Sequence, residues 1–138
     1  MRLYVNGQDI EYLILADLDE QKAEVSRFEG GPEKFLSFIN AFLAERKMTN
    51  KDVDELAVVT GPGSATALRS ILTNLNIMQS LQQIKIVKIE KNKDEHDIDT
   101  INRIRSGEGV HTENGQIILP DYQSEPKITS SKKDKLGR

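Results

Sequence analysis

The chain has 138 residues, of which 37% are hydrophobic and 30% are charged, and its formal net charge is −3. This length suits one soluble domain with a modest core. Because there is no cysteine, disulfide bridges and thiolate metal sites are excluded. No apolar run approaches the ~20 residues of a membrane span, and the start is not a signal peptide, so we expect a cytoplasmic protein that does not bind membranes.

Three strands joined by short turns are expected at the start of the chain, over residues 2–6, 11–17 and 22–28. The third alternates polar and apolar side chains, which is typical of an edge strand with one solvated face. The three strands together predict an antiparallel meander.

A helix is expected over residues 32–47. Pro32 suits its first position, and Glu33 suits its positively polarised N-terminal end. Arg46 and Lys47 suit its negatively polarised C-terminal end. Apolar side chains at helical spacing give it one broad apolar face: Phe35, Leu36, Phe38, Ile39, Phe42 and Leu43.

The sequence Thr49-Asn50-Lys51-Asp52 resembles a capping box before the next strand. That strand, over 56–60, is an unbroken β-branched run, which indicates burial on both faces. A second helix is expected over 64–82 and a further strand over 84–89. The order βββαβαβ predicts an α/β fold with a mixed sheet, helices packed on it and right-handed crossovers.

The remaining chain carries weaker signals. Residues 91–95 resemble a polar linker, and residues 98–104 a short helix with Ile98, Ile101 and Ile104 on one face. A hairpin turn at 113–115 follows. We therefore expect an α/β lobe at 1–90, a closing linker, short helix and hairpin at 91–126, and a basic, disordered tail at 127–138.

Residues 61–69 form the most specific stretch. By spacing alone, Gly61-Pro62-Gly63-Ser64 is a turn with a serine helix cap, and it matches neither a P-loop nor a Gly-x-Gly-x-x-Gly fingerprint. The stretch also resembles the Gly-Pro-Gly-Ser-Phe-Thr-Gly/Ala-Leu-Arg signature of the TsaB (YeaZ) family, although Ala65 replaces the usual phenylalanine. The matching residues are Gly61, Pro62, Gly63, Ser64, Thr66, Leu68 and Arg69.

Both ends of the chain share this resemblance. Residues 3–9 are similar to the opening strand and loop of the family, with Gly7-Gln8 in place of Thr-Ser, and 119–129 are similar to its closing segment. The second lobe that family members carry between these parts is missing. The resemblance therefore implies a single actin-like (ASKHA or ribonuclease-H-like) lobe, a TsaB reduced to its first lobe.

The resemblance implies a non-catalytic subunit for the synthesis of N6-threonylcarbamoyladenosine on tRNA. In the family, the first two helices pack against matching helices of TsaD, which carries the catalytic metal, and the ATPase TsaE joins the pair. The resemblance implies no catalytic residue, cofactor or metal in this chain. The alternative for the apolar helix residues is that they complete a thin core. The expected interface residues are Phe35, Phe38, Phe42, Arg69, Ile71, Leu72, Leu75 and Met78.

The sequence offers little for catalysis. Ser64 could be a nucleophile only with His96 or His111 as its base, and both histidines are expected to be ordinary surface residues. The run Asp94-Glu95-His96-Asp97 is expected to be a solvated charged linker rather than a metal site.

Two alternatives and one question stay open. The chain could be a small nucleotide-binding or enzymatic actin-like domain that holds phosphate with Gly7 and the Gly61 turn, or a homodimeric structural module that pairs through the same helices.

Residues 1–60 carry net −5 and residues 61–138 net +2. The basic tail is therefore either a solvated end or a contact for tRNA phosphates.

Overall fold

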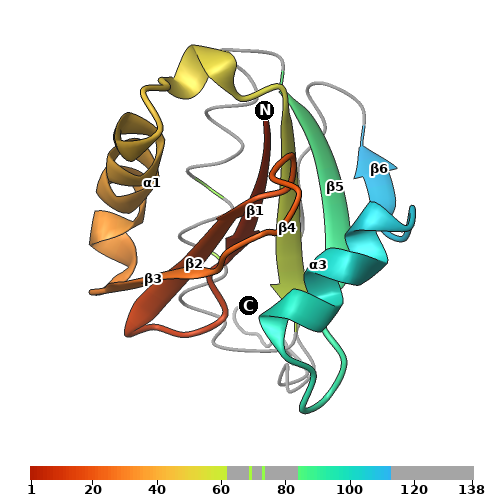
Figure 1. Cartoon of the computed structure of the whole chain (residues 1–138). Coiled ribbons are helices and arrows are strands. Elements are labelled where there is room, and N and C mark those ends of the chain that lie inside the picture. The colour runs from red at the N-terminus through yellow and green to blue at the C-terminus, as the bar shows by residue number, and fades with distance from the viewer. Residues whose placement is uncertain (62–68, 70–72, 74–83, 113–138) are drawn as a thin grey trace, which may run out of the picture.

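The computed structural model describes residues 1–61, 69, 73 and 84–112. Within them, one six-stranded sheet has the order β3-β2-β1-β4-β5-β6 (Figure 1). The strands are β1 (Arg2–Asn6), β2 (Tyr12–Asp17), β3 (Ser26–Glu29), β4 (Glu55–Gly61), β5 (Lys85–Glu90) and β6 (Val110–Thr112).

The sheet is mixed, as expected. Strands β1, β2 and β3 form the antiparallel meander, whereas β4 runs parallel to β1 and β5 parallel to β4. Strand β6 returns antiparallel to β5. The predicted α/β class and mixed sheet are therefore confirmed, and β3 lies at one edge of the sheet, as its alternating pattern predicted.

The central strands are buried on both faces because alternate side chains feed two separate cores. In the register, Leu3 lies beside Leu56, which lies beside Ile86, and all three belong to the first core. The next residues, including Tyr4 and Ala57, belong to the second core. This explains why β4 is a continuous apolar run rather than an alternating one.

Helix α1 (Phe35–Glu45) covers the first face. One turn of 3-10 helix, η1 (Pro32–Lys34), precedes it, and Pro32 lies in the first turn because its missing N–H costs nothing there. The helix ends where Lys47 adopts a positive φ of 59°. Four side chains of α1 are fully buried against the sheet: Phe35, Ile39, Phe42 and Leu43.

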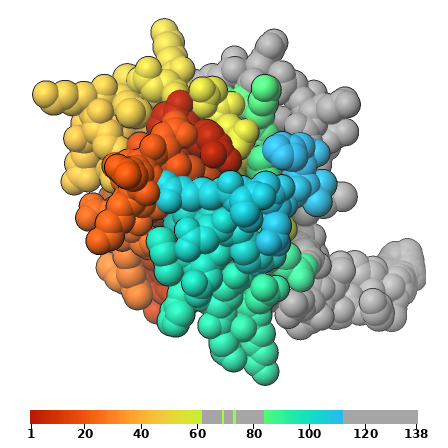
Figure 2. Space-filling view, turned by 45° about the vertical axis from the view of Figure 1, so that its right-hand side comes forward, coloured from red at the N-terminus to blue at the C-terminus, as the bar shows by residue number. Residues whose placement is uncertain are grey.

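Helix α3 (Asp97–Arg105) covers the opposite face, where Ile101 and Ile104 pack on the second core. Figure 1 shows α1 and α3 on opposite sides of the sheet, and Figure 2 shows α3 lying between the first strands and β6. The short helix predicted at 98–104 is thus confirmed. Ile98 was expected on the same face as Ile101 and Ile104 but is 42% exposed, because Asp97 and Thr100 turn inward instead.

The capping box predicted at residues 49–52 is confirmed at the one-turn helix η2 (Asn50–Asp52). The Thr49 N–H donates to Asp52 Oδ2 at 2.8 Å, and the Thr49 hydroxyl accepts from the Lys51 N–H at 3.3 Å. This turn leads the chain from α1 into β4.

The third strand begins later than predicted, at Ser26 instead of residue 22. The residues just before it do not pair with β2, because the chain there packs toward the α3 side of the sheet. Ala23 is buried in the second core, and Arg105, at the end of α3, donates to the preceding backbone carbonyls of Leu18, Glu20 and Gln21. No helix in the described part of the chain is long and apolar enough to cross a membrane.

Candidate functional site

The predicted interface residues on helix α1 differ in how deeply they are buried. Phe35 and Phe42 were expected to contact a partner, but both are fully buried between α1 and the sheet. The structure corrects that expectation, because a side chain that fills the core cannot also form a docking surface. The exposed face of α1 consists mostly of small or short side chains: Leu36, Ser37, Asn40, Ala41 and Ala44.

Phe38 keeps part of its surface accessible. Its ring stacks on Phe28 of the edge strand β3, with the ring centres 5.3 Å apart. Gly30, between β3 and η1, has a φ of 149°, and a Cβ there would come within 2.7 Å of the Phe38 ring. The position therefore needs glycine for both backbone and space. Of the three predicted phenylalanines, only Phe38 is partly exposed.

The second part of the predicted interface falls mainly outside the described residues. This applies to Ile71, Leu72, Leu75 and Met78, and to all of the family motif except its two ends. Gly61 ends β4, and its carbonyl accepts the Lys91 N–H at 2.9 Å. Arg69 and Thr73 are helical and exposed, and the Thr73 hydroxyl donates to the Arg69 carbonyl at 2.8 Å.

A polar cluster lies where β1 ends and α3 begins. The Tyr4 hydroxyl and the Asn6 amide both donate to Asp97 Oδ1, at 2.6 and 2.7 Å. The Lys91 ammonium, just after β5, lies 3.8 Å from the same oxygen. We call Tyr4, Asn6, Lys91 and Asp97 the carboxyl-end cluster, because it lies at the carboxyl ends of the parallel strands, where open α/β sheets bind ligands.

Tyr4 is the most deeply buried member of this cluster. Burial disfavours its phenolate, and the nearby Asp97 carboxylate adds to that penalty, so the pKa of Tyr4 lies well above its ordinary value. The hydroxyl therefore stays protonated and donates to Asp97. A buried tyrosine with one charge-assisted bond anchors α3 to the sheet rather than serving as a proton carrier.

The charged run at residues 94–97 is more ordered than predicted. The Glu95 side chain is only 10% exposed and accepts from Arg103 at 2.7 Å and from the Asn92 N–H at 2.9 Å. Burial alone would raise the pKa of Glu95, but these hydrogen bonds and the Arg103 charge outweigh it, so the pKa is lowered. The expectation of a solvated linker is thus wrong for Glu95 and Asp97, which fix α3 in place.

Both histidines are exposed, as expected. His96 caps α3 without a side-chain hydrogen bond, and His111 lies on β6. Ser64 lies outside the described residues. Among the residues that the structure describes, no group of three or more histidine, aspartate or glutamate side chains could hold a metal ion.

The carboxyl-end cluster is the feature that the sequence did not predict. Tyr4 and Asp97 are separated by 93 residues, and only the approach of α3 to β1 brings them together. One signal was available. Tyr4 carries a hydroxyl between the apolar Leu3 and Val5, and a buried tyrosine usually needs a hydrogen-bond partner.

The mixed sheet, with α1 and α3 on opposite faces, defines an α/β lobe, and solved structures contain a similar one. YeaZ from Pseudomonas aeruginosa matches with a TM-score of 0.57 at 19% identity, over 65% of this chain and 43% of that chain. A structure described as an uncharacterized protein with similarity to peptidase YeaZ from Pseudomonas aeruginosa matches with a TM-score of 0.56 at 21% identity, with the same coverage.

These similarities establish a YeaZ-like fold for the matched part of the chain. The chain spans less than half the length of either solved structure. No family model matches the sequence, and no curated protein matches it.

Proposed function

We propose that this chain is a reduced, TsaB-like subunit that binds and stabilises TsaD in the complex that makes N6-threonylcarbamoyladenosine on tRNA. The observation that carries the proposal is the fold similarity to YeaZ over 65% of the chain. The strand order β3-β2-β1-β4-β5 with helices on both faces supports the finer assignment to an actin-like lobe. The resemblance at residues 61–69 supports it independently, because the motif comes from the sequence alone.

The exposed face of α1 is the proposed docking surface for TsaD. Its small side chains, such as Ser37, Ala41 and Ala44, would allow a second helix to approach closely. Leu36, which is 39% exposed, adds apolar area. Charged side chains lie at the two ends of the helix, at Glu33 and Lys34 and at Glu45 and Lys47, so the centre of the face would lose little hydration on binding.

The carboxyl-end cluster supports a binding role over phosphate chemistry. Asp97 brings a carboxylate to the end of β1, beside the loop that begins at Gly7. A phosphate there would meet that negative charge, and the Lys91 ammonium beside it already faces Asp97. In the proposed function the chain has no activity alone, and it contacts TsaE or tRNA only within the complex or through its basic tail.

The proposal is tested by co-expression with TsaD from the same genome, followed by size-exclusion chromatography with light scattering. Wild-type chain is expected to give a one-to-one complex. Ala41→Arg places a long cation at the centre of the α1 face and should remove the complex. Asn102→Arg is the matched control, because it adds the same side chain to an exposed position of α3.

Two separate peaks for the wild-type chain and TsaD at micromolar concentration would count against the proposal. A stable homodimer that ignores TsaD would favour the structural-module alternative, and Ala41→Arg would then show whether α1 forms that dimer. Calorimetry with ATP and ADP tests the nucleotide-binding alternative separately.

A further inference from the structure

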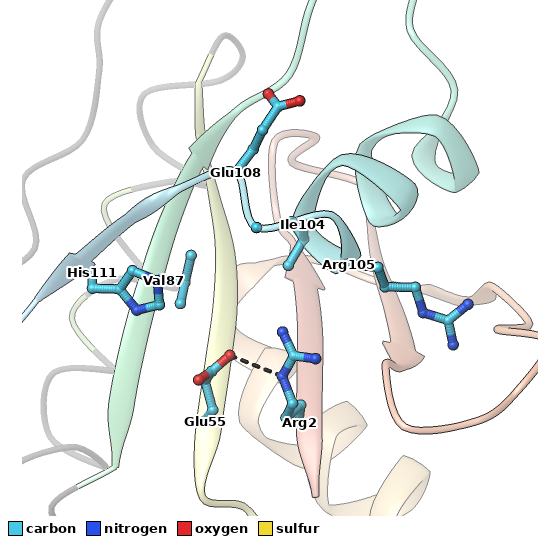
Figure 3. Close-up of a pocket in the computed structure, with 8 residues that line it drawn as sticks. Arg2, Glu55, Val87, Ile104, Arg105, Glu108 and His111 are labelled. Carbon is cyan, nitrogen blue, oxygen red and sulfur yellow. Dashed lines mark hydrogen bonds and ion pairs between the residues drawn. The ribbon is translucent and has the colours of Figure 1, made fainter.

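A small pocket lies on the α3 face of the sheet, at the end opposite the carboxyl-end cluster (Figure 3). It holds about 180 Å³, well below the ~300–1,000 Å³ of clefts that take drug-sized ligands. Its walls come from four strands, from the end of α3 and from the turn after it. The side chains that matter for its chemistry are Arg2, Glu55, Val87, Ile104 and His111.

Two charged groups face this pocket as a pair. Arg2 on β1 donates through Nε to Glu55 Oε2 on β4 at 3.0 Å, and the Glu55 side chain is only 17% exposed. The two terminal nitrogens of Arg2 have no hydrogen bond within the described part of the chain. Each member of the pair therefore keeps bonding capacity, nitrogen donors on Arg2 and the second oxygen on Glu55.

The other charged side chains at the pocket have partners elsewhere. Arg105 is bonded to carbonyls before β3, and Glu108 accepts from Arg103 at 3.0 Å. Figure 3 shows both side chains pointing away from the Arg2–Glu55 pair. Val87 and Ile104, which are 2% and 3% exposed, form the narrow apolar floor of the pocket, and the His111 ring lies beside Val87.

This combination of groups selects a particular ligand chemistry. A guanidinium binds a carboxylate through two parallel N–H bonds, and a carboxylate accepts from an ammonium. Because Arg2 and Glu55 lie side by side, a simple anion would gain from one and be repelled by the other. A ligand that carries an ammonium and a carboxylate on one carbon atom satisfies both, and the apolar residues favour a short aliphatic group next to them.

We propose that the pocket binds a free α-amino acid with a short aliphatic side chain. Its carboxylate bonds to Arg2, its ammonium bonds to Glu55, and its side chain packs on Val87 and Ile104. The site lies on the face opposite α1 and does not depend on the proposed role with TsaD. A binding failure here would leave that role untouched.

The test is a titration of the full chain followed by two-dimensional amide NMR. L-valine is the probe, isovalerate is the probe without its amine, and isobutylamine is the probe without its carboxylate. L-valine is expected to shift resonances of the pocket residues saturably, with a Kd at least ~10-fold lower than either half-ligand, since losing one charge-assisted bond costs about that factor.

Two variants assign the contacts. Arg2→Met should remove L-valine binding, and Glu55→Gln should remove the preference for L-valine over isovalerate while keeping the side-chain shape. Arg27→Met and Glu29→Gln are the controls, because Arg27 and Glu29 form a comparable ion pair on the edge strand β3, at 2.5 Å. Both controls should bind L-valine like the wild type.

The proposal is overturned if L-valine gives no saturable shift at millimolar concentration. It is also overturned if isovalerate binds the wild-type chain as tightly as L-valine does, or if Arg2→Met binds as well as Arg27→Met. The amide spectrum itself reports whether each variant is folded, so a loss of binding cannot be confused with a loss of structure.

Discussion

Tyr4, Asn6 and Asp97 connect the first strand to the first turn of α3 through two short hydrogen bonds to one carboxylate oxygen. All three side chains are buried or half-buried, and the Lys91 ammonium lies 3.8 Å from the same oxygen. Breaking either bond would leave a charged oxygen short of donors in a partly buried place. Individual residues of this junction should therefore be measurable in stability.

The first prediction concerns the hydroxyl of Tyr4. Tyr4→Phe keeps the ring but removes the donor to Asp97, so the free energy of unfolding should fall by about 1.5–3 kcal/mol, the range for hydrogen bonds to charged groups. Urea unfolding measures it. Tyr12→Phe is the control, because Tyr12 is only half-buried and its ring packs under Arg27, and the change there should stay within about 0.5 kcal/mol. Equal effects of the two variants would contradict the importance of the Tyr4–Asp97 bond.

The second prediction concerns alkaline pH. The pKa of Tyr4 is raised in the folded protein, whereas an unfolded tyrosine titrates at about 10. Above pH 10 the unfolded chain loses this proton and the folded chain keeps it, so stability is full below pH 10 and falls as pH rises. Relative to Tyr4→Phe, the wild type should lose about 1.4 kcal/mol of unfolding free energy per pH unit above 10. Parallel pH curves for the two proteins would show that Tyr4 titrates normally.

The side chains of the core were predictable, and their long-range polar partners were not. The apolar run of β4 and the stripe on α1 follow from local periodicity, so Leu56, Ile39 and Leu43 were assigned correctly. Asp97 ends a run of eight charged or polar residues, 90–97, and such a run usually faces water. Its burial depends on the long-range contact between α3 and β1, and the sequence around Asp97 does not predict that contact.

At the scale of the elements, α1 shows what apolar side chains at helical spacing do and do not predict. Its apolar residues were predicted, but a stripe does not say which members fill the core and which remain at the surface. The structure separates them, with Phe42 inside and Leu36 at the outer edge. The start of β3 was harder to predict, because Ala23, just before it, packs in the second core instead of pairing with β2.

The third prediction tests this division of α1. Phe42→Ala should lower the free energy of unfolding by about 3–5 kcal/mol, because it leaves a cavity in a packed core. Leu36→Ala should cost less than about 1 kcal/mol, because the side chain is partly solvated in the folded state. Thermal or urea unfolding of both variants measures this. Comparable losses would mean that α1 is rotated about its axis relative to the described arrangement.

At the scale of the whole molecule, α1 and α3 give the described part of the lobe two different faces. The α3 face is held by ionic and polar contacts at both ends of the helix, through Asp97 and Arg105. The exposed face of α1 consists mostly of small side chains, and no ionic contact is described at its centre. The matched part corresponds to 43% of the YeaZ chain, so partner binding by this lobe would rest on that limited surface.

Amide hydrogen exchange of the chain with and without TsaD is a direct test of the proposed docking of TsaD on α1. We expect slower exchange over residues 35–45 in the mixture, and unchanged exchange over residues 97–105. The α3 segment serves as the internal control, because it lies on the opposite face of the same sheet. Unchanged exchange over residues 35–45, or protection confined to 97–105, would contradict the account.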